Sequence, residues 1–187
     1  MADKQALRPS VALFPLPVTL VTVGEHPGVS NIITLAWDCT FSAQPPLLTM
    51  SIGPRKHSVA MLKANGEFVV NLAPRSLMRQ ADLCGMVSGR DHDKWLESGL
   101  TPVPAEKVRP PLIAECPVNM ECVLRQVVPI GGRELFVGEV VALHAEAAAL
   151  DENGRVDPGR IDAIAYSQAQ YWSQKEKLAV HGYSMKK

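Results

Sequence analysis

The sequence predicts a mainly β domain, a closed barrel decorated with a few short helices. Two observations support this: many short runs have strand character, and turn signals rich in Gly, Pro, Asn or Asp separate them. The 187 residues suit one domain, so we expect a single unit over 1–187. We expect an N-terminal arm over 1–10 and a C-terminal helix or tail over 167–187. A barrel of this length has little room inside, so a ligand would lie on its outside.

Strand patterns dominate the first part of the chain. The run Pro17–Val23 is apolar on both faces and predicts a core strand, and Gly24–Gly28 predicts the turn after it. Two further strands are predicted over Ser30–Trp37 and Leu47–Ile52, joined by a Pro-containing connection.

The middle of the chain alternates helix and strand signals. A helix is predicted to begin at Ser58, a good N-cap residue, and to end at Gly66. Glu67–Leu72 alternates as a half-buried strand does. A second helix is predicted to begin at Pro74 and to stop at Gly85, and a short third helix ends near Gly99.

The last third predicts a long hairpin and a helical tail. Val118–Pro129 and Glu134–Ala145 are two β-patterns around a Gly-Gly turn. His144, on the second of them, has no visible carboxylate partner. Ile161–Tyr166 predicts a final strand, and Ala169–Val180 predicts a C-terminal helix.

Composition excludes several classes of protein. Nineteen basic and nineteen acidic residues give a formal net charge of zero, which argues against a nucleic-acid binder. The apolar run Val11–Val23 is too short and too broken to span a bilayer, and no signal-peptide cleavage site follows it. We therefore expect a cytoplasmic protein with no membrane partner.

The cysteines suggest neither a metal site nor a redox motif. The four cysteines form no C-x-x-C pair, so we expect free, mostly buried thiols. Cys84 and His92 are two potential ligands without the third or fourth that a metal site needs. Motifs for covalent catalysis, a Rossmann nucleotide site or a P-loop are also absent from the sequence.

One stretch combines the features that a phosphate group needs. Gly53 ends a strand, Arg55 and Lys56 supply two cations, and Ser58 opens a helix whose first N–H groups lack intrahelical partners. The same residues could serve only capping and solubility, because Ser caps near a cation are common.

Polar and aromatic residues elsewhere leave two interpretations open. Asn31 and Thr34 lie within a half-buried strand and need partners, which could be the local backbone or a ligand. Trp37 could belong to the core or lie beside a ligand. Three late aromatic residues could anchor the tail or cover a ligand: Tyr166, Tyr171 and Trp172.

Several segments follow one another in a distinctive order. The first four are Asn31–Trp37, Pro45–Ile52, Arg55–Ser58 and Gly66–Leu72. Three more are Cys84–Lys94, Glu121-Cys122 and Phe136–Val140. In their order and spacing they resemble the flavin reductase-like family, the FMN-binding split barrels that include flavoredoxins and NAD(P)H:flavin oxidoreductases. The resemblance covers roughly Pro15–Tyr171.

The resemblance implies a fold, a cofactor and a site. It implies an FMN-binding split β-barrel of Greek-key type with a few short peripheral α-helices, and a homodimer with FMN near the subunit interface. It implies neither a catalytic residue of the chain nor a metal. The implied cofactor-binding residues are Asn31, Thr34, Leu35, Ala36, Trp37, Ser51, Ile52, Gly53, Arg55, Lys56, His57, Ser58, Cys84, Ser88, Lys94 and Tyr166.

The implied function is an FMN-dependent oxidoreductase that passes electrons from NADH or NADPH through FMN to a small-molecule or protein acceptor. This agrees with the missing catalytic motifs, because a bound flavin would carry the chemistry. Three alternatives remain: a flavoredoxin-like electron carrier without its own nicotinamide site, a ferric-complex reductase, and a split barrel that has lost flavin and serves as a structural partner.

Overall fold

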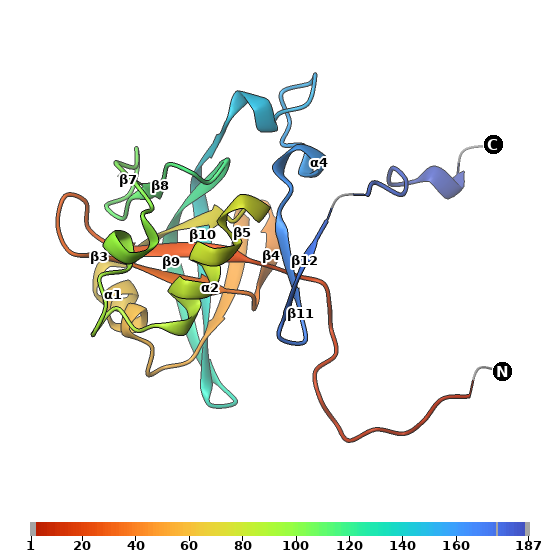
Figure 1. The fold of residues 1–187 in the computed structure, drawn as a ribbon, viewed down its shortest axis with the longest axis horizontal. Coiled ribbons are helices and arrows are strands. Elements are labelled where there is room, and N and C mark those ends of the chain that lie inside the picture. Colours follow the sequence, from red (N-terminus) through yellow and green to blue (C-terminus); the bar gives the residue numbers. More distant parts are fainter. Residues whose placement is uncertain (1–2, 175, 186–187) are drawn as a thin grey trace.

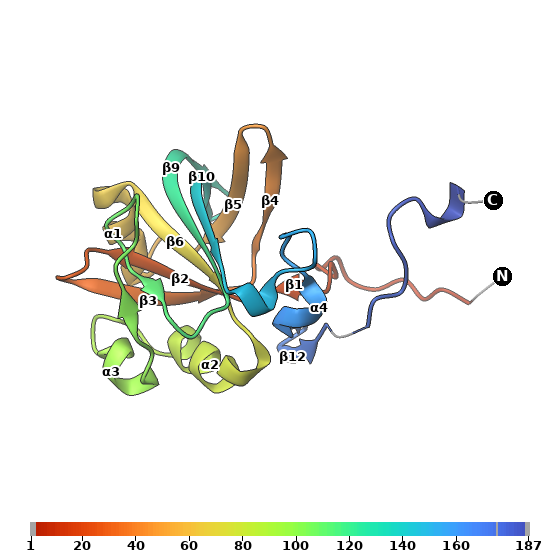
Figure 2. The same cartoon turned by 90° about the horizontal axis from the view of Figure 1, so that it is seen from above.

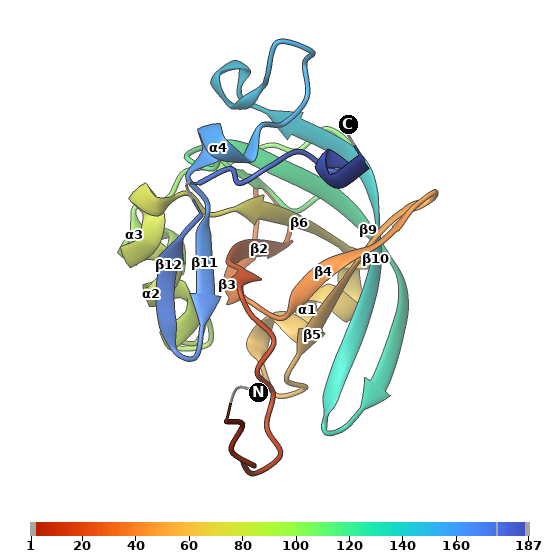
Figure 3. The same ribbon diagram turned by 90° about the vertical axis from the view of Figure 1, so that its right-hand side faces the viewer.

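The computed structural model describes residues 3–174 and 176–185. Its main element is a curved antiparallel sheet of seven strands in the order β3-β2-β6-β9-β10-β5-β4 (Figure 1, Figure 3). These strands are Thr19–Gly24 (β2), Ser30–Leu35 (β3), Asp38–Ala43 (β4), Pro46–Ile52 (β5), Glu67–Leu72 (β6), Val118–Ile130 (β9) and Arg133–Ala145 (β10). The predicted mainly β class is confirmed.

Two small sheets and short helices surround the large sheet. The small sheets are β1 (Leu16–Pro17) with β11 (Ile164–Ser167) and β12 (Gln170–Ser173), and β7 (Pro102–Val103) with β8 (Leu112–Ile113). The α-helices are α1 (His57–Asn65), α2 (Met78–Met86), α3 (Lys94–Ser98) and α4 (Pro158–Ile161). Short 3₁₀ turns are Arg75–Leu77, Ala147–Ala149 and Tyr183–Met185.

The expectation of a closed barrel is wrong, because the large sheet has two free edges. Strands β3 and β4 are its two ends, and no ladder joins them. Figure 2 shows the two ends diverging, with β2 and β3 on one side and β5 and β4 on the other. The reason is the pairing of β4, which forms a hairpin with β5 from Asp38↔Met50 to Ala43↔Pro46 instead of extending β3.

Strand β4 also corrects two predicted boundaries. The strand predicted over Ser30–Trp37 ends at Leu35, and the connection expected before Leu47 contains this additional strand. Most residues of β4 are exposed, because it is an edge strand. Its sequence therefore lacks the apolar alternation by which a half-buried strand is recognised.

The sheet separates two hydrophobic clusters, and β2 contributes to both. Val21 packs on the side of α1, and Leu20 packs on the side of α2 and α3. This explains why the strand is apolar on both faces, as predicted. Phe68 is fully buried within the first cluster. A Cβ at Gly138 would come within 2.3 Å of the Phe68 ring, so the glycine makes room for it.

The helices begin and end differently from two of the predictions. Gly66 is the left-handed C-cap of α1, as predicted, but Lys56 rather than Ser58 is its N-cap residue. The predicted stop at Gly85 is wrong, because α2 continues through it to Met86. A Cβ at Gly85 would lie 3.3 Å from the Thr34 Cβ, so the glycine allows α2 to lie close against β3.

The predicted helix over Ala169–Val180 is also wrong. Strands β11 and β12 form a hairpin, with Gln168 and Ala169 at positive φ in its turn. Residues 174 and 176–180 form no helix, and residue 175 lies outside the described residues. The predicted strand from Ile161 begins only at Ile164, because Pro158–Ile161 forms α4. By contrast, the long hairpin of β9 and β10 agrees with its prediction within one residue at each end.

Candidate functional site

Two adjoining cavities lie where β3, the end of β5 and helix α2 meet. We call the first, about 370 Å³, the wide chamber, and the second, about 230 Å³, the narrow chamber. Four residues line both of them: Ile33, Lys56, Gly85 and Met86. The two chambers therefore adjoin along β3, and we call them together the groove.

All the predicted site residues line this groove, although they come from separate segments of the chain. In the wide chamber lie Thr34, Leu35, Ala36, Trp37, Ser51, Ile52, Gly53, Lys56 and Tyr166. In the narrow chamber lie Asn31, Arg55, Lys56, His57, Ser58, Cys84, Ser88 and Lys94. That they bind a cofactor stays a prediction.

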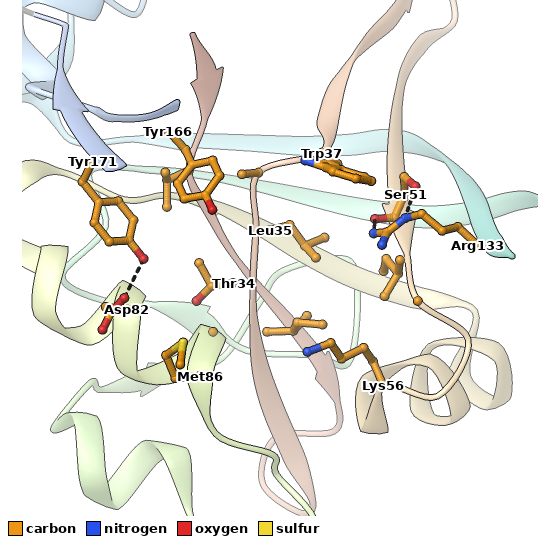
Figure 4. Close-up of a pocket in the computed structure, with 16 residues that line it drawn as sticks. Thr34, Leu35, Trp37, Ser51, Lys56, Asp82, Met86, Arg133, Tyr166 and Tyr171 are labelled. Atoms are coloured by element: carbon orange, nitrogen blue, oxygen red, sulfur yellow. Dashed lines mark hydrogen bonds between the residues drawn. The ribbon is translucent and has the colours of Figure 1, made fainter. Parts of the chain in front are cut away.

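An aromatic ring and a cation form one wall of the wide chamber (Figure 4). The Arg133 Cζ lies 4.3 Å from the centre of the Trp37 ring, a cation–π contact. The same guanidinium donates from Nε to Ser51 Oγ at 2.8 Å and from Nη2 to the Ser51 carbonyl at 2.5 Å. Trp37 is 47% exposed, so its ring does not belong to the hydrophobic core.

Two tyrosines from the small C-terminal sheet form the opposite wall. Tyr166 and Tyr171 pack edge to face with ring centres 5.8 Å apart. The Tyr171 hydroxyl donates to Asp82 Oδ1 on α2 at 2.9 Å, which ties the hairpin of β11 and β12 to that helix. Burial and this hydrogen bond raise the pKa of Tyr171 to about 12, so its hydroxyl stays protonated.

Two polar residues of β3, Asn31 and Thr34, find partners within the protein. Thr34 Oγ1 donates to the Ala81 carbonyl at 2.6 Å, and Asn31 Nδ2 donates to Ser58 Oγ at 2.8 Å. The Ser58 hydroxyl proton is then available to a further acceptor in the narrow chamber. Thr34 therefore bonds the backbone of α2 and not its local backbone, whereas Asn31 orients a side chain at the start of α1.

The narrow chamber brings cations to the beginning of a helix. Arg55 and Lys56 lead into α1, and Arg90 approaches from the loop after α2. The N-cap residue of α1, Lys56, makes no side-chain capping hydrogen bond, so the first N–H groups of the helix have no capping side chain as a partner. A Cβ at Gly89 would come within 2.2 Å of Asn31 Oδ1, so only glycine allows this loop to close on β3.

Lys94 and Cys84 support the narrow chamber from within the fold. Lys94 is 5% exposed, and its Nζ donates to the carbonyls of Ile32 at 2.8 Å and Cys84 at 2.6 Å. Burial lowers the pKa of the Lys94 ammonium and raises the pKa of the Cys84 thiol. Lys94 thus joins α3 to β3 and α2, and Cys84 is a poor nucleophile because its thiolate is disfavoured.

Sequence reasoning missed several residues that line the groove. Gly85, Met86, Gly89 and Arg90 come from a segment that the family resemblance had singled out, so that segment was the available signal. Asp82 and Arg133 gave no such signal, because a helix surface and a hairpin turn normally carry charged residues.

The described part of the chain contains neither a metal-binding cluster nor a membrane-spanning helix. Among residues 3–174 and 176–185, no three or more His, Cys, Asp and Glu side chains gather as a metal site would require. In the same residues, no helix has the length and apolar character to cross a membrane.

The chain matches the family model described as "Flavin reductase like domain" over residues 11–174. It is 34% identical over 146 residues to an uncharacterized protein of Archaeoglobus fulgidus, a match that covers 78% of this chain and 80% of the relative.

Solved structures show the same fold. The flavoredoxin of Desulfovibrio vulgaris (Miyazaki F) superposes with a TM-score of 0.91 at 27% identity, covering 98% of this chain and 100% of that one. An FMN-binding protein from Thermus thermophilus, solved with bound 1-cyclohex-2-enone, superposes with a TM-score of 0.81 at 27% identity, covering 96% and 99%. The predicted split-barrel fold is thereby confirmed, and the chain belongs to the flavin reductase-like family.

Proposed function

We propose that the chain binds FMN in the groove and passes electrons from NADH or NADPH through it to an acceptor. The observation that carries this proposal is that the two chambers adjoin and share four lining residues. A space lined in part by the apolar side chains of Trp37, Leu35 and Ile52 adjoins a cationic one at the start of α1. A flavin mononucleotide has the same division, with a planar ring at one end and one phosphate at the other.

The residues present fit this cofactor. The phosphate end offers Arg55, Lys56 and Arg90 beside the first N–H groups of a nine-residue helix, an arrangement that favours anions. The ring end offers apolar surfaces from Leu35, Ile52 and Trp37. Bound FMN would supply the hydride and electron transfer, while the chain binds it, orients it and limits its contact with water.

We propose FMN rather than FAD, because one cationic loop beside one helix start suits one terminal phosphate. The FMN-binding protein of Thermus thermophilus supports this choice through the family relationship. Titration of flavin-free protein with both flavins tests it. Clearly tighter binding of FAD would overturn the assignment.

A second candidate is a flavoredoxin-like carrier that takes electrons from another protein and has no nicotinamide site of its own. The 0.91 superposition on a flavoredoxin favours it. A ferric-complex reductase is a third candidate, distinguished by its acceptor. A family member that has lost flavin would be the structural alternative.

One experiment separates these candidates. The absorbance spectrum of the purified protein is recorded, and NADH or NADPH is then added without oxygen. A yellow protein that bleaches is the proposed enzyme, and ferric complexes or quinones offered afterwards identify the acceptor. A yellow protein that does not bleach is the carrier, and a colourless protein that added FMN does not convert is the structural alternative.

We also propose that the protein is a cytoplasmic homodimer with FMN near the subunit interface. The supporting observation is the exposed apolar surface of the N-terminal arm and its surroundings, where Leu13 is 82% and Phe14 52% exposed. Such residues gain from being covered by a second copy.

A further inference from the structure

One cation of the groove lies apart from the group that faces the narrow chamber. Arg133 lines only the wide chamber, whereas Arg55 and Arg90 line the narrow one and Lys56 lies between them. A phosphate in the narrow chamber already has its cations. Arg133 therefore needs another explanation.

The chain holds the Arg133 guanidinium in a fixed place. Gly131 and Gly132, with φ of 57° and 76°, form the tight turn that sets Arg133 at the first position of β10. Its Nε and Nη2 both donate to Ser51, and the plane rests against Trp37. A guanidinium fixed in this way has already lost most of its rotamer freedom, so it binds an anion at a lower entropic cost.

The charges that line the wide chamber are unbalanced. Among the described residues lining it, Lys56 and Arg133 are basic and Asp82 is the single acidic residue. Asp82 lies across the chamber and accepts the hydrogen bond of Tyr171. Figure 4 shows Lys56 and Arg133 reaching into the cavity from one side, opposite the two tyrosines. Apolar walls strengthen the field of such a pair.

We propose that Arg133 is a specificity-determining residue that favours a planar reactant carrying an anionic group over a neutral reactant of the same shape. This inference rests on the proposed function, because the reactant would lie in the wide chamber against the flavin. The anionic group could belong to the electron acceptor or to the nicotinamide donor, and the test separates these two sources.

The experiment measures binding to the flavin-loaded protein by isothermal titration calorimetry. Benzoate and benzamide are probes of nearly equal shape, one anionic and one neutral, and NAD⁺ represents the donor without reducing power. The variants are Arg133→Met, which removes the charge, and Arg133→Lys, which keeps it. Arg125→Met is the control, because Arg125 is on the same hairpin and pairs with Glu139 at the surface.

Wild type should bind benzoate more tightly than benzamide. Arg133→Met should weaken the binding of an anionic ligand about tenfold, as the loss of one charge-assisted hydrogen bond implies. It should leave the affinity for benzamide unchanged. Arg133→Lys should recover part of the loss, and Arg125→Met should match wild type. If Arg133→Met weakens the binding of benzoate but not of NAD⁺, the anionic group belongs to the acceptor. If Arg133→Met weakens the binding of NAD⁺, the anionic group belongs to the donor.

Two results would overturn the inference: equal binding of benzoate and benzamide by wild type, or equal losses for all three ligands in Arg133→Met. The second result would show that Arg133 only supports Trp37 as a wall. Failure of the proposed function is a separate result. The same samples are first titrated with flavin, and this titration shows directly whether they bind it before any probe is added.

Discussion

Asn31 on β3 donates a 2.8 Å hydrogen bond to the hydroxyl of Ser58 in the first turn of α1. Both side chains are buried, with 5% and 2% of their surfaces exposed. The bond joins the strand to the helix at the point where the narrow chamber begins. It also leaves the Ser58 proton free to donate toward an anion in that chamber.

Ser58→Ala should lower both stability and flavin affinity. The amide of Asn31 would lose its acceptor inside the fold, which costs about 1–3 kcal/mol of unfolding free energy. Denaturant unfolding of Ser58→Ala, Asn31→Ala and the double variant measures this. A coupling of about 0.5 kcal/mol or more between the two changes is expected, and purely additive losses would show that the bond contributes nothing.

The double variant Arg55→Ala/Lys56→Ala should weaken FMN binding about 10- to 100-fold while the protein stays folded. Both side chains lie at the start of α1 and can donate to a phosphate there. Lys63→Ala is the matched control, because Lys63 lies in the last turn of the same helix and pairs with Glu134. Fluorescence titration with FMN decides: unchanged affinity in a folded double variant excludes the phosphate site.

The sequence predicted the groove better than the fold around it. Strand β3 and the segment from Gly53 to Ser58 contain polar residues and cations where a core strand and a simple turn would not need them. That conflict left two interpretations open, and the resemblance to the family selected the residues. By contrast, β4 was missed because an exposed edge strand carries no apolar alternation. The β11–β12 hairpin was missed because its turn uses Gln168 and Ala169 at positive φ instead of glycine.

Other contacts depend on the meeting of distant segments and left no local signal. Glu121 is an example: its carboxylate accepts three backbone N–H bonds, from Glu106, Lys107 and Val108, and contacts His144 Nε2 at 2.6 Å. The prediction that His144 has no carboxylate partner is therefore wrong. Arg133 is similar, because its partners Trp37 and Ser51 lie over eighty residues away in the chain.

Asp38 should make stability depend on pH. Its carboxyl is buried, Thr19 Oγ1 donates to its Oδ2 at 2.5 Å, and Oδ1 has no partner among the described residues. Burial raises the pKa of Asp38 from 3.8 to about 6, although the Thr19 bond opposes the shift. The folded protein therefore holds this proton more tightly than the unfolded chain does. The resulting stabilisation is present below about pH 4 and is lost as the pH rises to about 6.

Asp38→Asn removes this dependence. Relative to wild type, the variant should gain roughly 3 kcal/mol of unfolding free energy between pH 4 and pH 7, the amount that corresponds to the pKa difference. Denaturant unfolding at several pH values measures the gain. Asp151→Asn is the control, because Asp151 is only partly buried and its pKa is lowered by backbone hydrogen bonds, which gives the opposite slope. A constant difference between wild type and Asp38→Asn across this range would show that Asp38 titrates normally.

The last prediction is that the protein forms a homodimer in which the interface and the flavin site share residues. The wide chamber is open, and good sites bury about 70–90% of a ligand's surface, so a second subunit would supply the missing wall. Two-fold symmetry then gives two equivalent sites. The exposed Leu13, Phe14 and Trp172 are the expected contributors, together with Tyr166 and Tyr171.

Light scattering combined with flavin quantitation tests this arrangement. We expect a dimer with one FMN per chain, and we expect Leu13→Asp with Phe14→Asp to give monomers that also release FMN. The coupling is the decisive observation, because exposed arm residues of a monomer could be replaced without any effect on the cofactor. A wild-type monomer that retains one FMN per chain at micromolar concentration, unchanged on dilution, would contradict the shared site.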